Sequence, residues 1–246
     1  MPNDTAPPDG DPEISIVLPT FCEAENIAAM IARLKKAVPS AEILVVDDDS
    51  PDLTWQIAAG AGARVIRRRG ERGLASALNR GIDEAKGKII AWMDADLSMP
   101  PEDVARLAGA IRAGADIAVG SRYAPGGRDL RPQLRVLTSL FINRLANLLL
   151  PVKVRDYDSG FVAARRDVFA SAPLPAGGHG EYCIEFLCLA GLRGFSIQEV
   201  GYVFSDRMRG RSKSAGGLIV FARHGINYLK RIIAVRLKYK QYMCPL

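Results

Sequence analysis

The sequence has 246 residues, of which 48% are hydrophobic and 24% are charged, as is ordinary for a globular chain that can bury a sizeable core. It contains no apolar stretch of about 20 residues, and its N-terminus lacks the positive and apolar regions of a signal peptide. The four cysteines form no CxxC pair and there are two histidines, which argues against a zinc site or a disulfide framework and favours a reducing cytosol.

The net charge of +6 is unevenly distributed along the chain. Ten of the 33 Lys and Arg residues lie between Arg207 and Leu246, and no Asp or Glu occurs there. The whole positive excess therefore belongs to the C-terminal segment. Such a segment is typical of surfaces that bind phosphate groups, an acidic membrane or nucleic acid.

The first half of the chain alternates predicted strands with predicted helices. Apolar runs predict strands at 14–18, 43–46, 64–66, 89–93 and 116–119. Helices are predicted at 27–38, 52–61, 74–86 and 100–112. This alternation predicts an α/β fold with a doubly wound, mostly parallel sheet that binds ligands at the carboxyl ends of its strands. The first strand–helix turn lacks G-x-G-x-x-G, which argues against a dinucleotide-binding enzyme.

The second half of the chain is less regular. The pattern predicts helices at 134–150, 181–193 and 216–240, a strand at 196–204, a mobile Gly- and Pro-rich loop at 124–132 and a basic loop at 205–215. We divide the chain into a flexible tail (1–12), one domain (13–215) and a C-terminal basic amphipathic helix with its tail (216–246).

The C-terminal helix is predicted to have one basic and one apolar face. This pattern fits a helix that lies in a membrane interface, and it fits equally a helix packed on the domain with its basic side in water. The chain shows no known nucleic-acid motif, so we expect no nucleic-acid binding.

The pattern D-x-D occurs at Asp9/Asp11, Asp47/Asp49, Asp94/Asp96 and Asp156/Asp158. Such a short pattern is weak, since a pair of solvated loop acids produces it easily. Only Asp94 and Asp96 directly end a wholly apolar strand in the middle of the alternating pattern. Two carboxylates at that position suit a hard divalent cation, Mg²⁺ or Mn²⁺, that bridges protein and phosphate oxygens.

Other charged residues are expected around the same crevice, and each has a second explanation. Glu23 follows the first strand, where a helix dipole also favours an acid. Asp47 to Asp49 end the second strand, and Asp49 and Ser50 also suit a helix cap. The basic loop suits phosphate binding, although an ordinary solvated loop has the same composition. Arg122 follows the strand that begins at Asp116 and is expected to point toward the crevice.

Six segments resemble, in order and spacing, the dolichol- or polyprenol-phosphate mannose synthases, which are inverting family 2 glycosyltransferases with the GT-A fold. The segments are 19–23 (PTFCE), 46–52 (VDDDSPD), 73–81 (GLASALNRG), 93–98 (MDADLS), 120–123 (GSRY) and 206–213 (DRMRGRSK). The resemblance implies a GT-A, Rossmann-like domain for residues 13–215. The chain departs from the family pattern at Phe21, Cys22 and Arg211, which replace tyrosine, asparagine and glutamate, and residues 156–160 match the family only loosely.

The resemblance implies a role for each matching residue. The base and ribose of a nucleotide sugar would contact Pro19, Phe21, Glu23, Val46 and Asp48. The metal and the diphosphate would be surrounded by Asp94, Ala95, Asp96 and Ser98, with Asp94, Asp96 and Ser98 as the metal ligands. The phosphates of donor or acceptor would be held by Arg122, Arg207 and Lys213, and these three residues, with Asp96, would be the catalytic ones.

The implied reaction is a metal-dependent, inverting transfer of a hexose from a nucleotide sugar to a polyprenyl or dolichyl phosphate, with mannose and GDP-mannose favoured. One alternative is a related transferase that uses UDP-glucose, another UDP-sugar or a non-lipid acceptor. A second alternative is a non-catalytic, membrane-associated protein that binds nucleotide sugars. We expect a cytoplasmic protein that is peripheral on the membrane through its C-terminal helix, with a membrane-anchoring subunit as a further candidate partner.

Overall fold

The computed structural model describes residues 11–178, 180–207 and 218–242. Its strands are β1 (Ile14–Thr20), β2 (Glu42–Asp47), β3 (Arg64–Arg67), β4 (Ile89–Trp92), β5 (Ile117–Ser121), β6 (Arg128–Asp129), β7 (Val162–Arg165), β8 (Ile197–Gly201) and β9 (Val203–Phe204). Its helices are α1 (Ile27–Ala37), α2 (Thr54–Gly60), α3 (Leu74–Glu84), the 3₁₀ turn η1 (Pro101–Asp103), α4 (Val104–Arg112), α5 (Gln133–Leu149), α6 (Val168–Ser171), α7 (Tyr182–Leu192) and α8 (Leu218–Tyr242).

The main sheet has the strand order β3-β2-β1-β4-β7-β5-β8. Its strands are parallel except for β7, which runs antiparallel to both β4 and β5. The predicted α/β fold with a mostly parallel sheet is therefore confirmed, and every strand predicted in the first half is present. The sequence pattern does not predict β7, which is only four residues long and holds two alanines.

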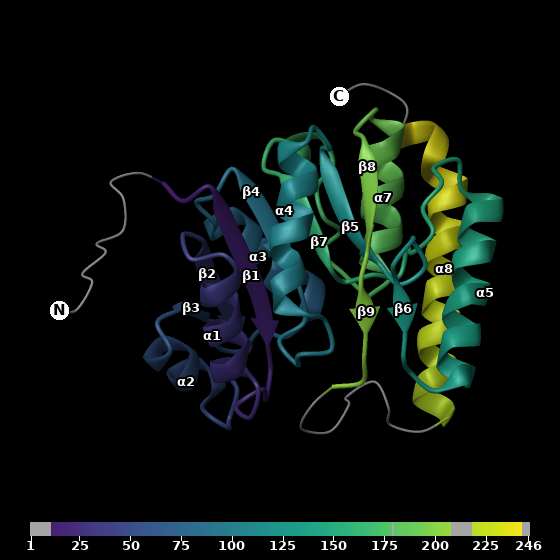
Figure 1. The fold of residues 1–246 in the computed structure, drawn as a ribbon. Coiled ribbons are helices and arrows are strands. Elements are labelled where there is room, and N and C mark those ends of the chain that lie inside the picture. The colour runs from purple at the N-terminus through teal and green to yellow at the C-terminus, as the bar shows by residue number, and fades with distance from the viewer. Residues whose placement is uncertain (1–10, 179, 208–217, 243–246) are drawn as a thin grey trace.

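Helices cover both faces of the sheet (Figure 1). Alternate residues of each strand point to opposite faces, so Val17 and Trp92 pack toward α3, α5 and α7, whereas Ile16 and Met93 pack toward α1 and α4. A sheet that is buried on both faces needs apolar residues at successive positions. This explains why the strands read as continuous apolar runs in the sequence.

The predicted strand at 196–204 is divided in the structure. It leaves the main sheet after Gly201, where a Cβ atom would lie 2.2 Å from the carbonyl oxygen of Pro125. The following residues form β9, which pairs with β6 in a separate two-stranded sheet. β6 lies inside the loop predicted to be mobile at 124–132, so backbone pairing fastens part of that loop.

The C-terminal helix α8 packs beside α5 and α7 (Figure 1). Ile232 and Val235 are fully buried in the core, whereas Ile233 is 54% exposed and Leu237 is 77% exposed. The single apolar face expected from the sequence is thus divided between core and solvent in the described part of the helix. No helix within the described ranges is both long enough and apolar enough to cross a membrane.

The close approach of α3 to the sheet yields a stability prediction. A Cβ atom at Gly81 would lie 2.3 Å from Cγ1 of Val17, whereas one at Gly109 in α4 meets nothing within 4 Å. We expect Gly81→Ala to lower the free energy of unfolding by about 1–2 kcal/mol, because overpacking outweighs the gain in helix propensity. The matched control Gly109→Ala should raise it by about 0.5–1 kcal/mol. Urea denaturation measures both, and a stabilised Gly81→Ala protein would contradict the packing argument.

Candidate active site

A cleft of about 500 Å³ opens at the carboxyl ends of the strands. Most residues singled out from the sequence line it, namely Pro19, Phe21, Glu23, Asp48, Asp94, Ala95, Asp96, Ser98, Arg122 and Arg207. Val46 does not line the cleft, because its side chain is fully buried in the core under α3. Lys213 lies outside the described residues.

The three aspartates at the end of β2 make different contacts. Asp47 is fully buried and accepts a hydrogen bond from the backbone N–H of Ser50 at 2.8 Å. Asp49 pairs with Arg67 at the surface, with 2.5 Å between Oδ1 and Nε. Only Asp48 of the three lines the cleft. The helix cap expected from Asp49 and Ser50 is wrong, because α2 begins after Leu53 and has no side-chain cap. The nucleotide explanation is left to Asp48.

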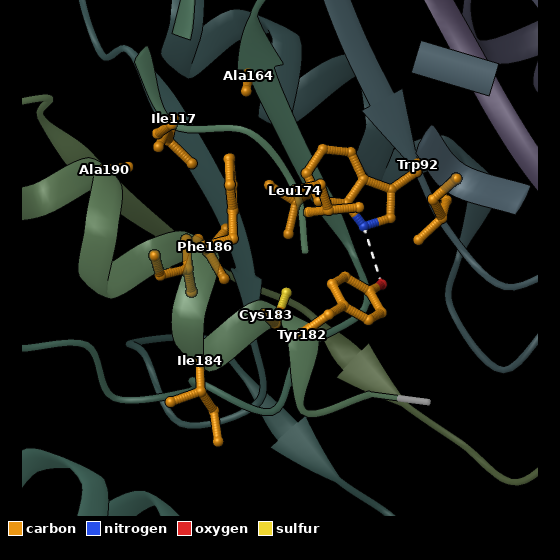
Figure 2. Packing of buried hydrophobic residues seen from close by; sticks show 14 of the residues in the cluster. Trp92, Ile117, Ala164, Leu174, Tyr182, Cys183, Ile184, Phe186 and Ala190 are labelled. Carbon is orange, nitrogen blue, oxygen red and sulfur yellow. Dashed lines mark hydrogen bonds between the residues drawn. The ribbon is translucent and has the colours of Figure 1, made fainter. Parts of the chain in front are cut away.

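The end of β4 is held in place by contacts with α7. Trp92 Nε1 donates a hydrogen bond to the hydroxyl oxygen of Tyr182 at 3.2 Å, as Figure 2 shows. The indole ring also packs edge-on against Phe186, with 5.7 Å between the ring centroids. Because Trp92 is almost the last buried residue before Asp94, these contacts hold the strand end from which Asp94 and Asp96 project into the cleft.

Asp96 is held from both sides. Its Oδ1 accepts hydrogen bonds from the backbone N–H and the hydroxyl of Ser98, at 3.0 and 2.6 Å. Its Oδ2 accepts one from Arg207 Nη2 at 3.1 Å, while Arg207 Nη1 lies 3.5 Å from Glu23 Oε1. Arg207 thus bridges Glu23, which follows β1, and Asp96, which follows β4. Its guanidinium group contacts the carboxylate at which the sequence predicts a metal ion. The hydroxyl of Ser98 donates its hydrogen bond to Asp96, so the lone pairs of its oxygen are not used in this contact.

Arg122 is buried in an ionic network. Its Nε lies 2.8 Å from Asp156 Oδ2, and its Nη2 lies 2.6 Å from Asp156 Oδ1 and 2.9 Å from Asp158 Oδ2. Burial alone would lower the pKa of Arg122, but the two carboxylates hold that pKa well above its usual value. Most of its donors therefore serve Asp156 and Asp158, and these two acids are not the solvated loop pair that a short D-x-D pattern usually indicates.

Asp158 connects separate elements around this network. It accepts hydrogen bonds from Arg122 and from the hydroxyl of Ser139 on α5, the latter at 2.9 Å. Burial alone would raise the pKa of Asp158, but the charge of Arg122 and a hydrogen bond from Tyr228 on α8 hold it below its usual value. The carboxylate thereby connects the chain after β5 with α5 and α8 at the wall of the cleft.

Three arginines that the sequence reasoning missed also line the cleft, namely Arg72, Arg131 and Arg135. Arg131 Nη2 lies 2.7 Å from Asp129 and 3.1 Å from Ser139, and its guanidinium stands over the ring of Phe204. Arg131 ends the Gly- and Pro-rich loop, and Arg135 opens the helix that follows. The signal that could have identified these residues was their positive charge in segments that lie at the carboxyl ends of the strands.

Comparison with known proteins identifies related sequences. Residues 15–171 match the family described as Glycosyl transferase family 2. A dolichol-phosphate mannosyltransferase of Pyrococcus furiosus is 38% identical over 89% of this chain, and the match spans 64% of that protein, slightly less than two thirds. A polyprenol monophosphomannose synthase of Mycolicibacterium smegmatis is 37% identical, over 83% of this chain and 82% of that protein.

Solved structures share the fold. Glucosyl-3-phosphoglycerate synthase from Mycobacterium tuberculosis, in complex with Mn²⁺, UDP-glucose and phosphoglyceric acid, superposes with a TM-score of 0.69. It is 25% identical, and the match covers 90% of this chain and 80% of that one. The GT-A fold expected for this chain is therefore confirmed.

The buried network predicts a dependence of stability on pH. The folded pKa of Asp158 lies below its unfolded value of about 3.9, so its stabilising effect is complete above that pH and is lost as the pH falls through the folded pKa. We expect the free energy of unfolding to fall as the pH is lowered from about 5 to about 3, and to fall less steeply in Asp158→Asn. Urea titrations across this range measure both slopes, and equal slopes would contradict the assignment.

Proposed function

This chain belongs to the glycosyl transferase family 2 and is a glycosyltransferase, and from this premise we propose that it transfers mannose from GDP-mannose to a polyprenyl phosphate with inversion. The curated relatives named above support the sugar and the lipid acceptor. The observation that carries the proposal is the division of the cleft into an acidic half and a basic half that meet at the ion pair of Asp96 with Arg207.

The acidic half suits the donor and a divalent cation. Asp94 and Asp96 offer the oxygen ligands that Mg²⁺ and Mn²⁺ prefer, and Asp96 already attracts the cation of Arg207. Among the described residues, no group of three or more His, Cys, Asp or Glu side chains gathers to enclose a metal. Asp94, Asp96 and Ser98 would hold such an ion together with oxygens of the substrate. When bound, such an ion stabilises the negative charge of a diphosphate.

The basic half suits the phosphate of the acceptor. Arg131 lines the cleft from the segment between β6 and α5, Arg135 from the first turn of α5, and Arg207 from the chain after β9. Asp129 orients Arg131, whose planar guanidinium matches phosphate oxygens. Arg122 adds a buried positive charge behind them. A polyprenyl phosphate already carries negative charge near pH 7, since the second pKa of a phosphate monoester is about 6.

The residues of the site therefore need to position the acceptor phosphate and do not need a strong base to deprotonate it. Arg131, Arg135 and Arg207 would hold the acceptor phosphate so that one oxygen lies in line with the anomeric carbon. The bond from that oxygen to the carbon forms while the bond to the diphosphate breaks, and the electron pair leaves with the diphosphate. Attack from the face opposite the leaving group inverts the configuration. Glu23 and Asp48, with Pro19 and Phe21, would hold the nucleoside meanwhile.

A related reaction is the second candidate. The solved structure that shares this fold contains UDP-glucose and phosphoglyceric acid, so a UDP-sugar donor and a small phosphorylated acceptor fit the same architecture in that protein. The two candidates differ in the donor base and in the need for a lipid. A direct assay of donors and acceptors separates them.

Exposed apolar side chains support a site on a membrane surface. On α5, Leu134, Leu137 and Phe141 are each more than 60% exposed and follow one another at helical spacing. On the neighbouring α8, Ile233 and Leu237 are exposed as well. Basic residues on the same helix, including Lys230, Arg236 and Lys238, would meet anionic lipid headgroups. We propose that this α5–α8 face rests on the membrane that holds the acceptor.

The donor assay tests the reaction. The protein is incubated with GDP-mannose, UDP-glucose and related nucleotide sugars, with and without a polyprenyl phosphate and a chelator. We expect mannosyl transfer that requires both the lipid phosphate and a divalent cation. Asp96→Asn should lower the rate by about a hundredfold or more, because metal stabilisation of the leaving group is worth several kcal/mol.

Asp11→Asn, which removes an exposed charge far from the cleft, is the matched control and should keep the wild-type rate. Transfer without any lipid phosphate would favour the second candidate. Tight binding of a nucleotide sugar without turnover on any acceptor would indicate a binding protein. Full metal-dependent activity in Asp96→Asn would contradict the assignment of the metal site.

The α5–α8 face is tested by co-sedimentation with vesicles that contain an anionic lipid. We expect Phe141→Glu to weaken binding by about tenfold or more, because burial of one large apolar side chain is worth about 1.5–3 kcal/mol. Leu53→Glu makes the same kind of change at an exposed leucine outside this face and should leave binding intact. If Phe141→Glu and Ile233→Glu both bind as well as wild type, this face does not contact the membrane.

A further inference from the structure

Arg72 lines the cleft but has no part in the reaction described above. Its guanidinium carbon lies 4.1 Å from the centre of the Phe21 ring, in a cation–π stack. Arg72 is otherwise exposed, and Phe21 is half-buried. The stack orients a fork of N–H donors at the wall of the cleft where the nucleoside of the donor is expected.

The backbone beside Arg72 is fastened to Asp48. The N–H of Gly73 donates to Asp48 Oδ2 at 2.9 Å, and Arg68 Nε donates to Asp48 Oδ1 at 2.7 Å. Gly73 has φ +144°, a conformation that other residues rarely adopt. Arg72 therefore belongs to a loop that Asp48 holds at Arg68 and Gly73. Its own side chain contacts Phe21, and both Asp48 and Phe21 are proposed to bind the nucleoside.

The order of the strands indicates which part of the donor reaches Arg72. From Asp94 and Asp96 after β4, the sheet passes through β1 and β2 to β3, and the loop after β3 carries Arg72. If the diphosphate of the donor binds at Asp94 and Asp96, the ribose attached to it falls next along the cleft, near Glu23 and Asp48. The base then lies farthest from the metal, at the end of the cleft where Arg72 is found.

The chemistry of the guanidinium favours one base at that place. An arginine fork has donors only, and guanine offers two adjacent acceptors, O6 and N7, along one edge. On the same edge, adenine has the acceptor N7 beside a donor, its N6 amino group. Uracil has the acceptor O4 with no second acceptor beside it. We propose that Arg72, held by its stack on Phe21, reads the base of the donor nucleotide and selects guanine over uracil. This inference rests on the proposed function and supplies the donor preference that the acidic residues leave undecided.

Calorimetric titration with GDP and with UDP, both in the presence of Mn²⁺, tests this role. We expect the wild type to bind GDP more tightly than UDP. Arg72→Ala should weaken GDP binding by about tenfold to a hundredfold and UDP binding by less than about threefold. Arg72→Lys keeps the positive charge but not the fork, so it should lose most of the same preference. Arg69→Ala, at an exposed arginine of the same loop outside the cleft lining, should bind both nucleotides as the wild type does.

Other outcomes overturn the inference in distinguishable ways. Equal weakening of GDP and UDP in Arg72→Ala would mean that Arg72 contacts the shared ribose or diphosphate. An unchanged preference in Arg72→Ala, or tighter binding of UDP by the wild type, would remove Arg72 as the selector of guanine. A wild type that binds neither nucleotide would overturn the proposed function as well. Loss of the preference in Arg72→Ala, in a protein that transfers no mannose, would uphold the role of Arg72 and reject the reaction.

Discussion

Buried charge is the constraint on which the architecture of the cleft depends. A carboxylate that is removed from water needs a cation or several donors, and without them its burial is strongly unfavourable. Asp48 is met by Arg68 from the loop after β3, and Asp156 is met by Arg122 from the end of β5. Each pair joins segments that are distant in the sequence. Satisfying the charges therefore also fixes the loops that line the cleft.

The arginines of the site that contact carboxylates fall into two groups according to how deeply they are buried. Arg68 and Arg122 are almost fully buried and direct their guanidinium groups at carboxylates, so they shape the walls of the cleft. Arg131 and Arg207 retain side-chain exposures of 16% and 18%, and with Arg72 they face the cleft itself. The cleft thus combines buried ion pairs in its walls with a small set of partly exposed cations.

Structural features that depend on contacts with other elements could not be predicted from the sequence patterns. The strand β7 has no signature, because four residues with two alanines carry neither clear alternation nor a marked β-propensity. It is a central strand because the facing edges of β4 and β5 both need backbone partners. Ile232 and Ile233 look alike in the periodicity of α8, yet packing against the core buries the first and leaves the second exposed.

The sequence by itself determined the alternation of strands and helices, the position of Asp94 and Asp96 after a buried strand, and the family resemblance. These follow from hydrophobic periodicity and short motifs, which are local properties of the chain. Only the tertiary structure decided which residues meet. Arg207 reaches Asp96 from 111 positions away, and Val46 is buried in the core although Asp48, two positions later, lines the cleft. Such contacts depend on the order of the strands in the sheet. That order results from the packing of all the elements against one another, and no local sequence pattern specifies it.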